Sequence, residues 1–204
     1  MSPSVMSTEY ECLSSVPEQP ELAPRALGLL LANMKRLAPS LPCGSGIFNS
    51  YGRVYIDTGC HCEIALIECD APEQVPLFME RQQCLISKAL PEAERQLGHR
   101  IVLANNNHSG LLQASRSFPV WGSHENYLVE KHPTSFSELI LPFLVTRLYA
   151  GAGGVEYPTG RFLAGVRPSA MQLPTGGSTT SQRAIHSTCR DEHHMGPNHK
   201  FFRY

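Results

Sequence analysis

The sequence lacks a long hydrophobic run, a secretion leader and an excess of charge of either sign. No segment of its 204 residues approaches the roughly 18 consecutive apolar residues of a membrane-spanning helix. The N-terminus has neither the basic start nor the apolar stretch of a signal peptide. A formal net charge of −1 gives no general attraction to nucleic acid or to an anionic membrane. We therefore expect a cytoplasmic protein that binds neither nucleic acid nor membranes.

The cysteines lack the regular spacing of a disulfide framework. There are seven of them, an odd number, and they are scattered along the chain. Cys60, His61 and Cys62, together with His193 and His194, could be taken for a zinc site. Zinc sites usually separate paired cysteines by about two to four residues, so this interpretation is disfavoured. We predict reduced thiols.

What the sequence does contain is a strand-like segment with charge on one face. Side chains alternate along a strand, so Arg53, Tyr55 and Asp57 point to one side, while Val54 and Ile56 point to the other. The apolar side can pack on a core. The polar side presents a cation, a phenol and a carboxylate in a row, which suits a phosphorylated, metal-bound ligand. A strand face that is simply solvated is the alternative.

A second strand-like run adds carboxylates. In STEYEC, Glu9 and Glu11 share one face, and Tyr10 points to the other. If this run lay beside the first, the carboxylates would repel one another unless a cation lay among them. Hard oxygen ligands suit magnesium or manganese better than zinc. The pattern predicts a magnesium site, and magnesium in turn suggests a nucleotide.

Hydrophobic periodicity and turn residues predict a mixture of helices and strands. The predicted helices span about residues 21–37, 72–90 and 135–150, and the second should cover the back of the sheet. On the first helix, the apolar stripe expected in the core comprises Leu27, Leu30, Leu31, Met34 and Leu37. Besides the Glu9 run, the predicted strands span about residues 46–49, 53–57, 63–68, 100–104 and 125–129. Loops are predicted over residues 39–45, 105–117 and 151–180, the last being rich in glycine and proline.

Several motifs occur in a characteristic order along the chain. They are STEYE, SYGRVYIDTGCHCEIALIECD, GSHENYLV, LPFLVTRLYAGAG and CRDEHH. In this order they resemble the family of Pup ligases and Pup deamidases, bacterial enzymes related to glutamine synthetase and the carboxylate-amine ligases. The resemblance is nearer to the Pup–protein ligases and covers the N-terminal half of that family.

The resemblance implies an α+β fold in which a curved, mostly antiparallel sheet forms a cradle backed by helices, as in glutamine synthetase. Residues 1–204 are then expected to form a single, partial catalytic domain that is truncated at its C-terminal side. Such a sheet has an exposed edge, which natural proteins usually cover or pair. A second chain or a homodimer is therefore an expected partner.

The resemblance also implies a reaction. ATP phosphorylates the side-chain carboxylate of the C-terminal glutamate of Pup, a small modifier protein, and a substrate lysine attacks to form an isopeptide bond. This pupylation directs proteins to proteasomal degradation. By position in the motifs, Glu9, Tyr55 and Glu63 would hold magnesium, Arg53 would contact ATP, and Asp57 would be the catalytic base for the lysine.

Two alternatives remain open. A Pup deamidase, or depupylase, shares these strands, but typically has a long insertion between the acidic strand and the Arg-x-Tyr-x-Asp strand. The short stretch of sequence between Glu9 and Arg53 leaves no room for this insertion, which favours the ligase. The other alternative is a non-catalytic or split remnant that binds a Pup-like tail or a partner chain.

The motif GSHENYL adds further candidate residues. On a strand, His124 and Asn126 would share one face, and Glu125 and Tyr127 would share the other. Either pair could lie beside the nucleotide or the bound glutamate, or could form a hydrogen-bonded network within the sheet. Arg190, in CRDEHH, could approach the substrate or form an exposed ion pair.

Overall fold

The computed structural model describes residues 5–104, 122–129, 142, 154–156, 159, 161–163, 173–176, 184–187 and 202–203. The chain separates into two compact units, one formed by residues 7–106 with 121–124, and the other by residues 1–6, 107–120 and 125–204. Arg190 and the predicted loop over 105–117 lie outside the described residues, as does nearly all of the predicted helix over 135–150.

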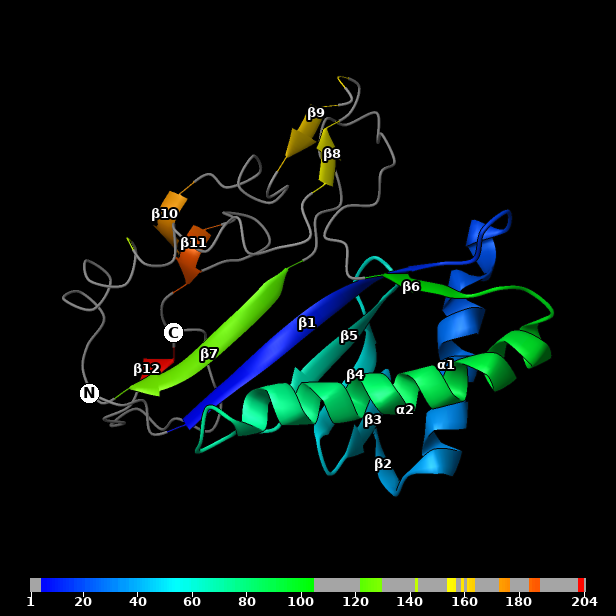
Figure 1. The fold of residues 1–204 in the computed structure, drawn as a ribbon, viewed down its shortest axis with the longest axis horizontal. Helices are drawn as coiled ribbons and strands as arrows, with labels where there is room; N and C mark the ends of the chain where they lie inside the picture. The colour runs from blue at the N-terminus through cyan, green and yellow to red at the C-terminus, as the bar shows by residue number, and fades with distance from the viewer. Residues whose placement is uncertain are drawn as a thin grey trace. The chain divides into compact units, whose positions relative to one another are not determined.

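An antiparallel sheet forms the centre of the first unit (Figure 1). Its strands, in spatial order, are β1 (Val5–Ser15), β5 (His61–Leu66), β4 (Gly52–Asp57), β3 (Gly46–Asn49) and β2 (Ser40–Cys43). A short strand, β6 (Val102–Ala104), also pairs with β1. The strand β7 (Ser123–Val129) begins next to β1, where the N–H of Glu11 donates to the carbonyl of Gly122 at 3.2 Å. The predicted α+β class with an open, largely antiparallel sheet is confirmed.

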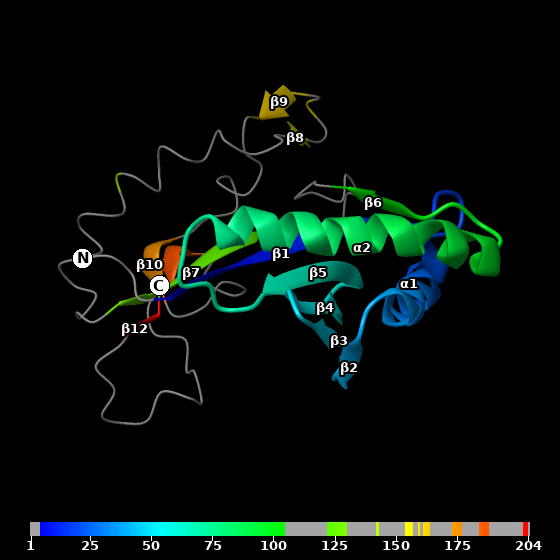
Figure 2. The ribbon, with the colours of Figure 1, turned by 60° about the horizontal axis from the view of Figure 1, so that its bottom comes forward.

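Helices cover one face of this sheet. They are α1 (Ala23–Leu37), which follows the short 3₁₀ helix η1 (Pro20–Leu22), and α2 (Gln74–Leu97). The helix α2 runs along the sheet and packs on β4 and β5, whereas α1 crosses α2 and packs on β3 and β4 (Figures 1 and 2). The predicted position of the second helix behind the sheet is therefore correct.

The hydrophobic core lies between these helices and the sheet. From α1, Leu27, Leu30 and Met34 are at most 1% exposed, and they meet Val54 and Ile64 from the strands. The predicted stripe is correct except at its end. Leu37 is 49% exposed, because the helix ends at this residue and its last turn extends beyond the packed layer.

The second helix is longer than predicted. It continues through Pro91 to Leu97, and Gly98, with a φ of 79° and an N–H bond to the Glu94 carbonyl, forms a left-handed cap. A proline inside a helix removes one helical hydrogen bond. The burial of Ala93 and Leu97 in the core outweighs the lost bond.

Buried amides connect the layers. The side chains of Asn49 on β3 and Gln82 on α2 each donate to the other, at 3.0 and 3.1 Å, and both are buried. Asn33 on α1 donates to Gln96 on α2 at 3.2 Å. Because a buried amide without a partner is costly, these pairs also select one alignment of the layers.

Strand boundaries differ from the predictions in a few places. Residues 39–45 contain β2 instead of a loop, because the segment pairs with β3 as the outer arm of a hairpin. The strand predicted over 63–68 is observed at His61–Leu66, and the one predicted over 125–129 begins at Ser123.

The second unit contains short strand pairs. Antiparallel pairs join β7 to β12 (Phe202–Arg203) and β8 (Gly154–Glu156) to β9 (Arg161–Leu163), and a parallel pair joins β10 (Leu173–Gly176) to β11 (Ala184–Ser187). The loop prediction for residues 151–180 is wrong at β8, β9 and β10, where backbone pairing overrides the glycine and proline content. Among the described residues, no helix has both the length and the apolar character needed to cross a membrane.

Candidate active site

The sheet face opposite the helices carries the candidate site. Strand register and the alternation of side chains place three rows on it. Read from β1 across β5 to β4, the rows are Glu9–Ala65–Arg53, Glu11–Glu63–Tyr55 and, on β5 and β4 alone, His61–Asp57. Glu63 is therefore the central residue, with Tyr55 and Glu11 beside it and Glu9 and Asp57 diagonal to it.

A glycine lets the neighbouring strand approach this grouping closely. Gly46 on β3 pairs with Tyr55 on β4. A Cβ atom at position 46 would lie 2.4 Å from the Cβ of Tyr55 and 2.3 Å from the carbonyl oxygen of Val54. Any larger residue would push β3 away from β4 and displace Tyr55. The local sequence SGIFN thus helps to fix one of the candidate ligands.

Glu63 is a buried carboxyl group surrounded by acids. It is only 4% exposed. Burial raises its pKa to about 7, and the nearby charges of Glu11, Glu9 and Asp57 act in the same direction. The hydrogen bond with Tyr55 opposes this shift but does not cancel it. A cation placed here would be strongly favoured, since it would allow Glu63 to ionise.

Tyr55 and Arg53 form a stacked pair beside Glu63. Burial raises the pKa of Tyr55, and the hydrogen bond with Glu63 and the surrounding carboxylates add to the shift, so the phenol is neutral. The guanidinium carbon of Arg53 lies 4.0 Å from the centre of the Tyr55 ring. Arg53 also donates to the carbonyl of Cys43 at 3.3 Å. Its positive charge is thus held in place beside the carboxylates.

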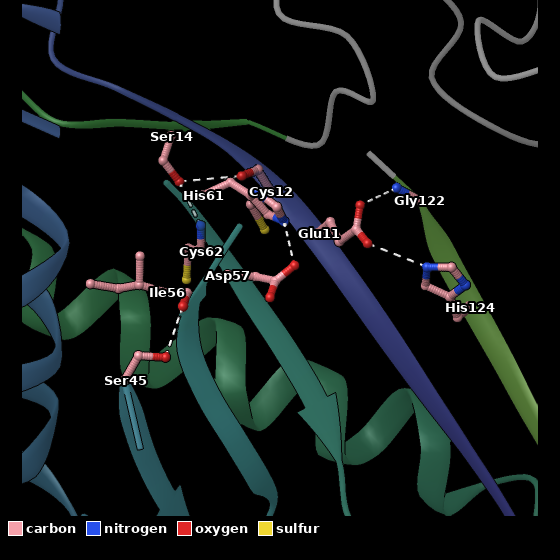
Figure 3. A network of polar contacts seen from close by, with 10 residues as sticks. All are labelled: Glu11, Cys12, Ser14, Ser45, Ile56, Asp57, His61, Cys62, Gly122 and His124. Carbon is pink, nitrogen blue, oxygen red and sulfur yellow. Dashed lines mark hydrogen bonds and ion pairs between the residues drawn. The ribbon is translucent and has the colours of Figure 1, made fainter. Parts of the chain in front are cut away.

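Glu11 is anchored to the start of β7. Its carboxylate accepts a hydrogen bond from the Gly122 N–H and lies 3.3 Å from Nε2 of His124 (Figure 3). Burial raises the pKa of Glu11, but the bonds from His124 and Gly122 outweigh burial and hold the pKa below its usual value. Glu11 is therefore ionised beside Glu63.

Among the described residues, Glu11, His61 and Glu63 form a grouping of possible metal ligands. One ligand atom from each lies within 4.8 Å of the others. Our sequence-based set for the metal was Glu9, Tyr55 and Glu63, and all three lie on this face, where Glu9 acts on both others through its charge. The cysteines of the Cys60-His61-Cys62 segment do not join them: Cys62 packs in the core on the opposite face.

Asp57 lies at the end of β4, at the margin of this grouping. Its side chain is 42% exposed, and its Oδ2 atom lies 3.9 Å from Nε2 of the buried His61 (Figure 3). The carboxylate is therefore accessible to an incoming group while remaining next to the acidic face.

The GSHENYL motif contributes in two ways. His124 contacts Glu11, as described above. On the same strand, the hydroxyl of Tyr127 donates to Glu125 at 2.8 Å, as expected for residues that share a face. Asn126 lies between them on β7.

His61 is the residue of this site that sequence reasoning missed. The signal was available, because His61 and Glu63 are two residues apart on one strand and so share a face. In the sequence, His61 stands out as part of a possible zinc motif with the adjacent cysteines, whose side chains point to the other side.

An open antiparallel sheet that has helices on one face and acids on the other is the arrangement of a glutamine synthetase-like α+β fold. The crystal structure of the complex between prokaryotic ubiquitin-like protein Pup and its ligase PafA superimposes with a TM-score of 0.74 at 25% sequence identity. The match covers 98% of this chain and 41% of that one.

Sequence comparison identifies the family. The model of the Pup-ligase protein family matches residues 13–203, and the chain belongs to this family. A Pup–protein ligase of Renibacterium salmoninarum is 32% identical, and one of Paenarthrobacter aurescens is 33% identical, each over 201 residues. The matches cover 93% of this chain but only 41% and 42% of those proteins. The chain thus spans about two fifths of the length of these curated relatives.

Proposed function

We propose that this chain carries the acidic sheet of a Pup–protein ligase. The enzyme would use ATP and magnesium to join the C-terminal glutamate side chain of Pup, or of a Pup-like protein, to lysines of protein substrates. The observation that carries the proposal is the burial of Glu63 among Glu9, Glu11 and Tyr55, with Arg53 alongside. So dense a group of acids is costly without a cation.

The residues on this face fit a hard divalent cation. Glu9, Tyr55 and Glu63 offer oxygen atoms, which magnesium prefers, and Glu11 lies next to Glu63. When bound, magnesium would neutralise the phosphates of ATP and the charge that develops during phosphoryl transfer. The raised pKa of Glu63 supports this role, since its carboxyl group is held ready to exchange a proton for a metal ion.

Arg53 would contact the phosphates of ATP. A guanidinium is always charged and donates several hydrogen bonds in a plane, which matches phosphate oxygens. Its stacking on Tyr55 and its bond to Cys43 fix the direction in which this charge is presented. Preorganisation of this kind reduces the reorganisation that binding would otherwise require.

Asp57 would act as the base for the substrate lysine. A carboxylate such as that of the Pup glutamate is inert to amines, because its negative charge repels them, and phosphorylation provides a leaving group. The amine attacks only when deprotonated, and the unperturbed pKa of lysine is about 10.4. A positioned base contributes roughly 10²- to 10⁴-fold in rate. The partial exposure of Asp57 supports access by a lysine from solvent.

We place the protein in the cytoplasm, where thiols stay reduced. All six cysteines in the described part of the chain are free, which agrees with this location.

Calorimetry with the 204-residue chain tests the proposal. We expect ATP to bind in the presence of magnesium and not after chelation with EDTA. The chain is then mixed with ATP, a lysine-bearing protein, and Pup ending in either glutamate or glutamine. A Pup–protein conjugate formed from the glutamate form supports the ligase, whereas release of ammonia from the glutamine form would indicate a deamidase. If ATP does not bind, the non-catalytic alternative is favoured.

A further inference from the structure

A buried histidine lies between the proposed metal ligands and the proposed base. His61 follows the tight turn after β4 and pairs with Asp57 across the hairpin. On the same strand it precedes Glu63 by two residues, and a ligand atom of its imidazole lies within 4.8 Å of Glu11 and Glu63. It therefore lies beside both parts of the candidate site, and its side chain is only 3% exposed.

The turn that carries His61 holds its backbone in a defined position. Only three residues, 58–60, separate the paired ends of β4 and β5, and the Cys60 N–H donates to the Asp57 carbonyl at 3.0 Å. Gly59 has a φ of 90° and Cys60 one of 61°. A left-handed conformation is unfavourable for a non-glycine residue such as Cys60, so the surrounding structure must enforce it. Asp57 and His61 are thus locked opposite each other.

The imidazole is also fixed. The backbone of Thr58, within the same turn, acts on the ring and opposes the lowering of the His61 pKa by burial. Its Nε2 atom lies 3.9 Å from Oδ2 of Asp57, and burial leaves the ring no room to swing into solvent. A rigid ring therefore lies against a carboxylate that is itself 42% exposed.

An exposed carboxylate needs such support in order to act as a base. Asp57 could otherwise rotate toward solvent, or toward the cation that the neighbouring acids are proposed to hold. In either position it would be turned away from the lysine. We propose that His61 is a positioning residue, whose imidazole holds the Asp57 carboxylate at the margin of the acidic face, available to the lysine amine. This inference rests on the proposed ligase function, and it requires no change in the protonation of His61.

Kinetics of conjugate formation test the role. We expect His61→Ala to lower kcat for conjugation roughly 10- to 100-fold, as misplacement of a catalytic group by about 1 Å can do. The KM for magnesium-ATP should rise far less than it does in Glu63→Gln. His61→Gln retains a donor and should recover part of the rate. Combined with Asp57→Asn, His61→Ala should cause no further loss, since the group that it positions is no longer a base. His99→Gln, just beyond the C-terminal end of α2, is the matched control.

The outcomes that would overturn the inference are definite. They are an unchanged kcat in His61→Ala, a loss that multiplies with that of Asp57→Asn, or a rise in KM for magnesium-ATP equal to that of Glu63→Gln. Circular dichroism melts of each variant exclude simple unfolding as the cause.

A second measurement does not depend on activity. If the wild-type chain forms no conjugate, the proposed function fails, yet the contact between His61 and Asp57 can still be tested. Melting temperatures of the wild type, Asp57→Asn, His61→Gln and the double variant form a cycle. Non-additive shifts support the contact, because residues that touch are coupled, whereas additive shifts overturn it.

Discussion

The two faces of the central sheet are equally buried in places but differ in chemistry. Toward the helices, Val54 is 0% and Ile64 is 1% exposed. On the opposite face, Glu63 is 4% exposed, although it carries a carboxyl group among other acids. Neighbouring residues of the same strand, Glu63 and Ile64, thus lie in environments of opposite character.

The contrast separates stability from function. Burial of apolar surface stabilises a protein by about 25 cal/mol per Å², whereas burial of an ionisable group is unfavourable unless a partner compensates for it. The helix-facing side therefore stabilises the fold, while the acidic side weakens it when no cation is bound. Local sequence choices that oppose stability are expected at functional sites.

The largest difference between the faces should appear in a substitution of the proposed base. Asp57→Asn removes a proton acceptor while preserving size, so we expect conjugation to fall roughly 10²- to 10⁴-fold. Binding of magnesium-ATP, measured by calorimetry, should be nearly unchanged. Glu63→Gln and Glu9→Gln are the contrasting variants, because they should weaken magnesium-ATP binding itself. Conjugation by Asp57→Asn at the wild-type rate would refute the assignment of the base.

On the helix-facing side, Leu30→Ala should act on stability alone. Leu30 is 0% exposed, and such a change typically costs about 2–5 kcal/mol in the free energy of unfolding. Urea denaturation measures the loss. Leu37→Ala, on the same helix but 49% exposed, is the control and should cost about 0.5 kcal/mol or less. Equal losses in the two variants would mean that the core has been placed wrongly.

The acidic face should produce a pH dependence that the apolar face lacks. The folded-state pKa of Glu63 is raised to about 7 from an unfolded value of 4.5. Its favourable contribution is therefore complete below pH 4.5 and is lost as the pH rises through about 7. Without metal, we expect the free energy of unfolding to fall by roughly 1–3 kcal/mol over this window.

Chemical denaturation at several pH values, with EDTA present, follows this fall. Glu63→Gln should remove most of it, and saturating magnesium should oppose it. Glu80→Gln, an exposed position on α2, should leave the profile unchanged. A pH profile that is identical in the wild type and Glu63→Gln would show that the crowded acids do not weaken the fold.

The smallest expected effect is a difference in the rate of alkylation between the cysteine thiols. Burial raises the pKa of Cys12 to about 12 and also raises that of Cys62, so neither forms much thiolate near neutral pH. At pH 8, iodoacetamide should label Cys43 and Cys84 faster than these two, as measured by mass spectrometry of tryptic peptides. In urea the four rates should converge. Rapid labelling of Cys12 in the folded chain would mean that the hydrophobic core behind the acidic face is accessible to solvent.

The strand pattern allowed much of this site to be predicted. Alternation alone places Arg53, Tyr55 and Asp57 on one face, and the same period brings Glu9 and Glu11 onto one side of β1. The register between strands could not be derived in this way, because it depends on hairpin geometry and on contacts distant in the sequence. For that reason the central position of Glu63 emerged only from the structure, whereas the spacing of His61 and Glu63 already places both on one face.

Local rules failed where tertiary contacts override them. The predicted helix over residues 72–90 ends too early, since the burial of Ala93 and Leu97 carries α2 past Pro91. Residues 39–45 were predicted as a loop but contain β2. This strand forms because β3 offers it a pairing edge. The contact between Glu11 and His124 joins residues separated by 113 positions, and no local pattern could have predicted it.

The amide pair Asn49–Gln82 has a consequence for the far side of the sheet. Its reciprocal bonds form only when β3 sits at one position against α2. Side chains alternate along a strand. A slip of β4 by one residue relative to its neighbours would therefore turn Arg53, Tyr55 and Asp57 toward the hydrophobic core. Two buried neutral amides, which no substrate can reach, thereby help to disfavour a shifted strand register in which the reactive side chains would be buried.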